Sequence, residues 1–181
     1  IRFNHDGVID SNDQAPIGYN PVPEMTFSLA AGLNWKGIDF SILLQGAARS
    51  SIYLQQDIAW DNFWGNYYEE HIGRWTPETA ATATYPRFTK AATPAHPNYY
   101  KSDYWLKDSK YLRLKNIQLG YTIPRKLLKK FGVRSLRVYA NAYNLFTWDN
   151  VKKVDPESSN NSNGQFYPQQ KVINFGINLN F

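Results

Sequence analysis

Residues 171–181 read KVINFGINLNF, and the period of this stretch recurs along the chain. Every second position is a large hydrophobe, in the order Ile173, Phe175, Ile177, Leu179 and Phe181. Asparagine, glycine and valine occupy the positions between them. Because successive side chains of a strand point to opposite faces, this pattern predicts a β-strand with one apolar face and one amide-rich face. The stretch stops on its apolar phase, whereas chain ends are commonly polar and frayed.

Four further segments alternate in the same way. The expected strands are residues 25–35, 38–46, 111–123, 135–146 and 171–181. The first two are joined by Lys36–Gly37, which predicts a hairpin with a minimal turn. In the third, the apolar phase changes at Lys115–Asn116, which predicts a β-bulge. The segment RKLLKKFG (125–132) predicts one or two helical turns ended by Gly132. The sequence therefore predicts an all-β, antiparallel fold.

The connections between these strands differ greatly in length. Short ones are expected at residues 36–37 and 124–133, and long loops at residues 1–24, 47–109 and 147–170. Strands in soluble proteins average about five or six residues, whereas a tilted strand that crosses a bilayer needs about nine to eleven. Long strands with alternately short turns and long loops are typical of outer-membrane barrels. A soluble antiparallel sandwich also alternates apolar and polar residues, and it is the alternative architecture.

Composition excludes several classes of protein. The 181 residues include no cysteine, so disulfide scaffolds and thiol chemistry are excluded. No apolar run reaches the roughly 18 to 20 residues of a membrane-spanning helix. The net charge is +5, but the basic residues are dense only in PRKLLKKFGVRSLR (124–137), between two expected strands. We therefore expect no nucleic-acid partner. Five strands cannot close a barrel, so in a membrane they would pair with further strands, and the chain is expected to be a piece of a longer protein.

Several motifs resemble one family when they are taken in their order along the chain. They are GVIDSNDQAPIG (7–18), IGRWTPE (72–78), TYPRF (84–88), DSKYLRLKNIQLGYTIP (108–124), LLKKFGVRSLRVYANAYNLFTW (127–148), DPE (155–157) and YPQQKVINFGINLNF (167–181). This set resembles the C-terminal end of SusC/RagA-family TonB-dependent transporters.

The resemblance implies a fold, a location and partners. Residues 1–181 would be the last five strands of a 22-stranded outer-membrane β-barrel, with the long loops outside the cell and the C-terminus at the periplasm. The whole protein would import oligosaccharide or peptide nutrients. Its partners would be a SusD-like surface lipoprotein, TonB through a plug domain upstream of this chain, the remaining barrel strands and the lipid bilayer. The terminal residues Phe175, Ile177, Leu179 and Phe181 would form the barrel-assembly signal.

Two groups of residues are candidates for contact with a substrate or a capping partner. The loop 47–109 carries the aromatic residues Trp60, Phe63, Trp64, Tyr67, Tyr68 and Trp75. Flat amphipathic rings suit sugar faces and partner proteins, although self-packing of the loop would explain them equally well. The inward phase of the strands carries polar residues, among them Arg113, Gln118, Arg137 and Asn141, which could touch solute or plug or simply bond within a wet lumen.

Metal binding and catalysis have weaker signals. The stretch FNHDGVIDSND (3–13) resembles a calcium loop, with oxygen ligands from Asn4, Asp6, Val8, Asp10 and Asp13. Arg2 stands where such a loop begins with aspartate, so an Asx-rich turn without metal is the alternative. Glu69 and Glu70 precede His71, but nothing marks the pair of separated carboxylates that a glycosidase needs. We expect no enzyme. The rival function is a soluble or surface β-rich carbohydrate-binding or adhesion module.

Overall fold

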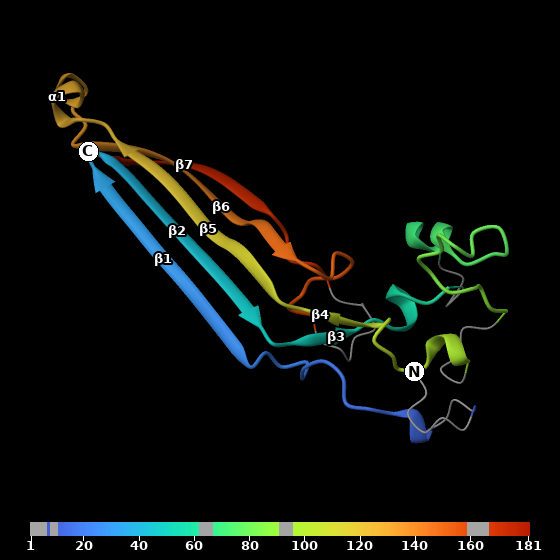
Figure 1. The fold of residues 1–181 in the computed structure, drawn as a ribbon. Coiled ribbons are helices and arrows are strands. Elements are labelled where there is room, and N and C mark those ends of the chain that lie inside the picture. Colours follow the sequence, from blue (N-terminus) through green and yellow to red (C-terminus); the bar gives the residue numbers. More distant parts are fainter. Residues whose placement is uncertain (1–6, 8–10, 62–66, 91–95, 159–166) are drawn as a thin grey trace.

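The computed structural model describes residues 7, 11–61, 67–90, 96–158 and 167–181. Its main feature is one long antiparallel sheet with strand order β1-β2-β5-β6-β7 (Figure 1). The strands are β1 (Met25–Trp35), β2 (Ile38–Ala48), β5 (Tyr111–Thr122), β6 (Ser135–Asp149) and β7 (Val172–Asn180). All five predicted long strands are therefore present, and each pairs with the next long strand along the chain.

The two predicted backbone irregularities are confirmed. At the β1–β2 turn, Lys36 and Gly37 have φ values of 47° and 91°, which gives the tight turn that suits the twist of paired strands. At the bulge, Lys115 has no partner, because Leu114 pairs with Leu44 and Asn116 pairs with Leu43. The bulge places Leu112 and Leu114 on the same face as Leu119, so the apolar face of β5 is continuous.

Strand β6 extends three residues beyond its predicted end and contains a second bulge. Tyr143 pairs with Asn116 and Phe146 with Leu114, so two residues of β6 lie opposite one of β5. Asn144 adopts a left-handed φ of 50° at this point. The extra residue returns Phe146 and Trp148 to the apolar face, and the strand continues to Asp149. The predicted loop 147–170 therefore begins three residues too early.

The sheet has one apolar and one polar face along its whole width. The register aligns Leu33, Phe40, Leu119, Ala140 and Phe175 across the five strands on the apolar face. Phe27, Leu119 and Phe175 are 46%, 56% and 82% exposed, and within the described chain no second sheet covers them. The described residues therefore do not form the closed sandwich that was the alternative architecture.

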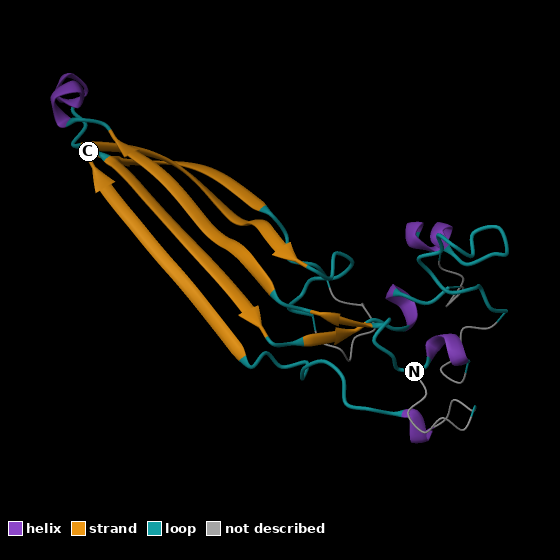
Figure 2. Cartoon of the chain, in the orientation of Figure 1, coloured by secondary structure: helices purple, strands orange, loops and turns teal. Residues whose placement is uncertain are grey.

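The connections segregate to opposite ends of the sheet (Figure 2). One end carries the tight β1–β2 turn and the connection made of α1 (Arg125–Leu128) and η5 (Lys129–Phe131), which ends at Gly132 with φ 71° as predicted. The other end carries the long loops, with η1 (Ser11–Asp13), η2 (Gln56–Ile58), η3 (Glu69–Gly73) and η4 (Pro97–Tyr99). Among the described residues, no helix has the length and apolar character needed to cross a membrane.

The loop end has its own small core. Strands β3 (Ser51–Tyr53) and β4 (Leu106–Asp108) pair within the predicted loop 47–109 and form a two-stranded sheet that the sequence did not reveal. Beside it, a cluster of buried residues comprises Ile52, Leu54, Ala59, Trp60, Tyr85, Tyr99, Trp105 and Val151. The long loop is therefore a packed structure whose core lies beyond the end of the main sheet.

Candidate functional site

The polar face of the sheet presents two charged side chains near the end that carries α1. Arg137 Nε donates to an Asp39 oxygen at 2.8 Å, and its Nη2 pairs with the other carboxylate oxygen. Arg137 also lies over the Tyr139 ring, 4.8 Å from its centroid. Gly120 makes this arrangement possible, since a Cβ there would lie 2.5 Å from both the guanidinium and the carboxylate. Arg137 therefore faces the polar side as predicted, but its charge is neutralised by a bidentate partner.

Amides occupy the middle of the same face. Gln118, Asn141 and Asn174 are aligned in register on β5, β6 and β7. Asn141 Nδ2 lies 3.3 Å from the Tyr143 hydroxyl, while its Oδ1 is buried without a hydrogen-bond partner among the described residues. Amides both donate and accept, so this row can bond to water, to a polar solute or to another part of the protein.

Arg113 lies at the loop end of the polar face, where it binds a loop and not solvent. Its Nη2 lies 2.8 and 2.9 Å from the two Asp155 oxygens, its Nη1 pairs with Glu157, and its Nε donates to Thr147 Oγ1 at 3.0 Å. The Tyr111 hydroxyl donates to Glu157 at 2.8 Å. Because the Arg113 side chain is only 2% exposed, it ties the loop after β6 to the sheet and is not free to meet a substrate.

This ion cluster perturbs one carboxyl group outside the sheet. Burial alone would raise the pKa of Asp155, but hydrogen bonds from Arg113 and from the Glu157 amide outweigh it and lower that pKa below its ordinary value. Asp155 is therefore an ionised partner of Arg113 at neutral pH.

Trp60 belongs to the loop core, where self-packing explains it. Its ring lies 4.7 Å from that of Tyr99, and the residue is 2% exposed. Next to it, buried Asp61 accepts hydrogen bonds from the hydroxyls of Tyr99 and Tyr85 and from the Thr89 amide. Burial, together with this carboxylate, raises the pKa of both tyrosines above the ordinary range. Both hydroxyls therefore stay protonated and act as donors.

The other aromatic candidates are divided between the surface and the residues outside the description. Tyr67, Tyr68 and Trp75 are 57%, 39% and 39% exposed. Tyr67 and Tyr68 both contact the ring of buried His71, whereas Trp75 is held separately by its backbone bond to Tyr85. Phe63 and Trp64 lie outside the described residues. The structure therefore brings Tyr67 and Tyr68 together on one part of the loop surface.

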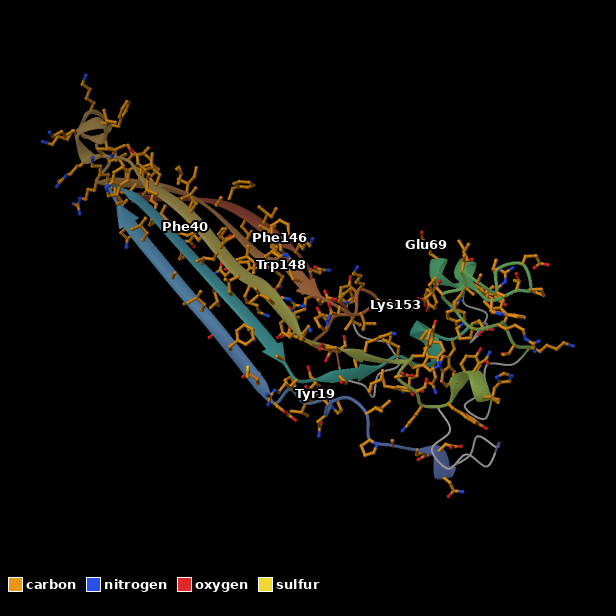
Figure 3. All side chains as sticks on the ribbon, viewed as in Figure 1. Tyr19, Phe40, Glu69, Phe146, Trp148 and Lys153 are labelled. Atoms are coloured by element: carbon orange, nitrogen blue, oxygen red, sulfur yellow. The ribbon has the colours of Figure 1, made fainter. Side chains whose placement is uncertain are left out.

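A concave site that the sequence did not indicate lies beside these tyrosines. Tyr68, Glu69, Glu70 and Lys153 line a cavity of about 310 Å³. Glu70 pairs with Lys153, and partial burial lowers the pKa of Lys153 to about 8. Figure 3 shows Glu69 and Lys153 on neighbouring parts of the loop end. Only the acidic pair stood out in the sequence, because Lys153 comes from a different loop, far along the chain.

The remaining predicted sites are placed as follows. Phe175, Ile177, Leu179 and Phe181 lie on or just after β7, with exposed fractions of 82%, 69%, 45% and 74%. In the predicted calcium loop, Asn4, Asp6, Val8 and Asp10 lie outside the described residues, while half-buried Asp13 lies in η1. Over the described ranges, no three His, Asp or Glu side chains gather closely enough to hold a metal ion.

His71, the histidine next to the acidic pair, has a structural role. The Tyr68 amide donates to its Nδ1 at 3.0 Å, so its Nε2 carries the proton and donates to the Ala59 carbonyl at 3.2 Å. With both ring nitrogens used in the loop core, His71 is not placed to act on a substrate.

Comparison with known proteins gives a consistent result. No protein-family profile matches the chain. It is 30% identical to TonB-dependent receptor P26 of Formosa agariphila over 98% of its length and 26% identical to TonB-dependent receptor SusC of Bacteroides thetaiotaomicron over all of it. These matches cover 19% and 17% of the two relatives, so the chain spans about a fifth of their length.

Solved structures agree on the fold. The chain superimposes on the RagAB peptide importer in its "open-open" state with a TM-score of 0.71 and in its "closed-closed" state with 0.64, at 22% identity in both. Each superposition covers 96% of this chain, and 19% or 20% of the chain in the solved structure. Taken with the open sheet, these matches place the chain in the outer membrane. Over nearly its whole length the chain is similar to TonB-dependent receptors, among them SusC, and its sheet has the fold of a segment of their β-barrel.

Proposed function

We propose that this chain forms part of the wall and outer mouth of a TonB-dependent importer of oligosaccharides or peptides that works with a SusD-like surface lipoprotein. One observation carries the proposal: a single sheet has an apolar face across five long strands, a polar face opposite, and its long loops gathered at one end. In an outer-membrane barrel these features become the lipid surface, the lumen wall and the extracellular mouth.

The polar face suits passage of a polar solute. Its charges are paired, as in the contact of Arg137 with Asp39, and its centre presents neutral amides. Exposed single charges would bind an oppositely charged solute tightly, whereas amides exchange hydrogen bonds with water at low cost. A wall of this kind allows neutral glycans and peptides of mixed charge to pass without strong retention.

The loop surface suits contact with a capping lipoprotein. Tyr67 and Tyr68 are exposed beside the cavity formed with Glu69, Glu70 and Lys153. Exposed tyrosines next to a concave polar site are typical of protein interfaces and of glycan contacts. The packed core beneath them, with Trp60 and Tyr99, would hold this surface in one shape.

Uptake by cells tests the proposal. A strain that lacks the full-length receptor should lose TonB-dependent accumulation of one labelled oligosaccharide or peptide from a panel, and the intact gene should restore it. The receptor should also stay in carbonate-washed membranes until detergent is added. Release into buffer, or accumulation that does not change when the receptor is deleted, would refute the proposal.

Co-purification tests the partner. A tag on the full-length receptor should recover one surface lipoprotein from detergent-solubilised membranes. The double substitution Tyr67→Ala and Tyr68→Ala should weaken that recovery, whereas Tyr143→Ala, on the polar face of the sheet, should not. Equal recovery from all three proteins would remove the loop surface from the interface.

The calcium site in residues 2–13 is also a proposal. Its support is the spacing of the oxygen-bearing side chains in the sequence, and binding of Ca²⁺ to the full-length receptor would test it.

A further inference from the structure

The positive charge of the chain is concentrated at the end opposite the long loops. The connection between β5 and β6 carries Arg125, Lys126, Lys129, Lys130 and Arg134, and residues 123–134 include no acidic side chain. Because the formal net charge of the chain is +5, the rest of it carries as many acidic as basic residues. At the same end of the sheet, Asp39 is neutralised by Arg137 on the polar face.

Large apolar side chains accompany these charges. Leu128 is buried and fixes α1 against the sheet, whereas Leu127 and Phe131 are 65% and 76% exposed. Leu127 lies in α1 and Phe131 in the following turn η5, so both exposed apolar side chains belong to the same connection as the cations. At the neighbouring β1–β2 turn, the Lys36 ammonium lies 4.9 Å from the centroid of the exposed Trp35 ring. Basic and aromatic residues combined in this way are typical of a membrane–water interface.

An apolar groove runs on the lipid-facing side of the sheet close to this end. It has a volume of about 460 Å³. Its lining residues include Ile38, Leu119, Tyr121, Val138, Ala140 and Phe175. The groove exists because Ala140 is small and lies in register between Leu119 and Phe175. Leu119 is three residues from the end of β5, so the groove lies roughly 10 Å from the basic connection.

We propose that the groove and the basic connection form one binding site for an anionic phospholipid of the periplasmic leaflet. An acyl chain would fill the groove over Ala140, and the phosphate would meet Lys126, Lys129 and Lys130 at the membrane surface. Leu127 and Phe131 would enter the interface beside the headgroup. The inference rests on the barrel orientation in the proposed function, with the long loops outside the cell.

Both parts of the site point to a lipid over an acidic protein or polysaccharide. An acidic partner could bind through the cations alone. It would not explain why Leu127 and Phe131 are exposed, or why a groove large enough for an acyl chain lies near the same end of the sheet. Stable association with a membrane takes two signals, such as an inserted apolar group and a cluster of basic residues, and neither is sufficient alone. Here the two signals come from adjoining elements of the same sheet end.

Native mass spectrometry of the full-length receptor, with added phosphatidylglycerol or phosphatidylcholine, tests the site. The triple substitution Lys126→Gln, Lys129→Gln and Lys130→Gln should weaken retention of phosphatidylglycerol by about fivefold per lysine and leave phosphatidylcholine unchanged. The matched control Lys90→Gln, Lys101→Gln and Lys152→Gln removes the same charge at the loop end and should change neither.

A second variant tests the groove independently of charge. Ala140→Phe should reduce retention of both lipids, whereas Ala31→Phe, which adds the same ring elsewhere on the apolar face, should not. Equal retention by the wild type and the triple variant would overturn the site, as would equal loss in both triple variants. If the triple variant kept phosphatidylglycerol but lost binding of an acidic protein, the cations would belong to that protein partner and the lipid site would be refuted. The proposed function fails by a different result, namely a receptor that stays in solution without detergent.

Discussion

Replacing Arg113 by methionine should release the loop after β6 from the barrel wall. The guanidinium satisfies Asp155 with two bonds of 2.8 and 2.9 Å and pairs with Glu157, and the Asp155 side chain is only 10% exposed. Removing one partner from a buried ion pair costs about 3–5 kcal/mol, because the remaining charge stays desolvated. Glu157 is 27% exposed and keeps Lys115 at 3.9 Å, so the lower end of that range is appropriate here.

A loss of about 3 kcal/mol corresponds to a change of about 100-fold in the opening equilibrium of the loop. Hydrogen exchange of the full-length receptor in detergent should show it at the amide of Glu157, which donates to Asp155. Arg113→Lys keeps the charge but loses the planar pair of bonds, so its effect should be intermediate. Arg137→Met, on the same face but at the other end of the sheet, should leave loop exchange unchanged.

The pH dependence of the variant distinguishes this explanation from general destabilisation. In the native protein the pKa of Asp155 is lowered, so its stabilisation is complete at neutral pH and is lost only as the pH falls through that lowered value. In Arg113→Met, burial acts without the guanidinium and should raise this pKa. The closed loop should then become more stable as the pH falls towards 5. The reasoning would be refuted if the opening equilibrium of the loop were the same in the variant and the native protein. It would also be refuted if that equilibrium shifted towards the open loop in the variant as the pH falls.

Three further substitutions test the fold at separate places. Gly120→Ala should lower the free energy of unfolding by about 1–3 kcal/mol, because its Cβ would overlap the Arg137–Asp39 pair. Gly32→Ala should lower it much less, because the Cβ there has only an ordinary contact of 3.5 Å. Urea unfolding of the solubilised receptor measures both. Trp60→Ala should open the loop core at a cost of about 3–5 kcal/mol and increase its cleavage by protease, with the strands of the sheet still protected. Asp10→Asn should weaken calorimetric binding of Ca²⁺ if the N-terminal loop holds a metal; a receptor that binds no Ca²⁺ would remove that site.

The alternating strands could be predicted because lipid or a packed neighbour imposes period two on every residue of a strand. The bulge at Lys115–Asn116 was visible for the same reason, as a change of phase between Leu114 and Ile117. The second bulge was missed because it leaves the alternation of β6 unchanged: Ala142 and Phe146 lie on the same face an even number of residues apart. A change of phase reveals a bulge only where the apolar positions after it move to the other parity.

The loop end could not be predicted in the same way, because its contacts are not periodic. Asp61 meets Tyr85, Thr89 and Tyr99, and no local signal links these positions. Arg113 looked like a lumen-facing group, since its strand phase is polar, yet its partners come from the loop after β6. Strand phase gives the face that a side chain occupies, but the partner on that face depends on how the loops fold back.

The two parts of the chain bury apolar groups in different surroundings, and the position of Arg113 follows from this. The loop core hides Trp60, Tyr99 and Trp105 almost completely, as a water-soluble protein does, whereas Leu29 and Leu33 on the sheet stay about 60% exposed. A loop that folds in water could therefore sit at many angles on a sheet that is stabilised by lipid. A directional contact is needed where the two meet, and the guanidinium of Arg113, bonded to both Asp155 and Thr147, supplies it. We expect that ion cluster to fix the shape of the outer mouth, while the lipid-facing strands determine only its position.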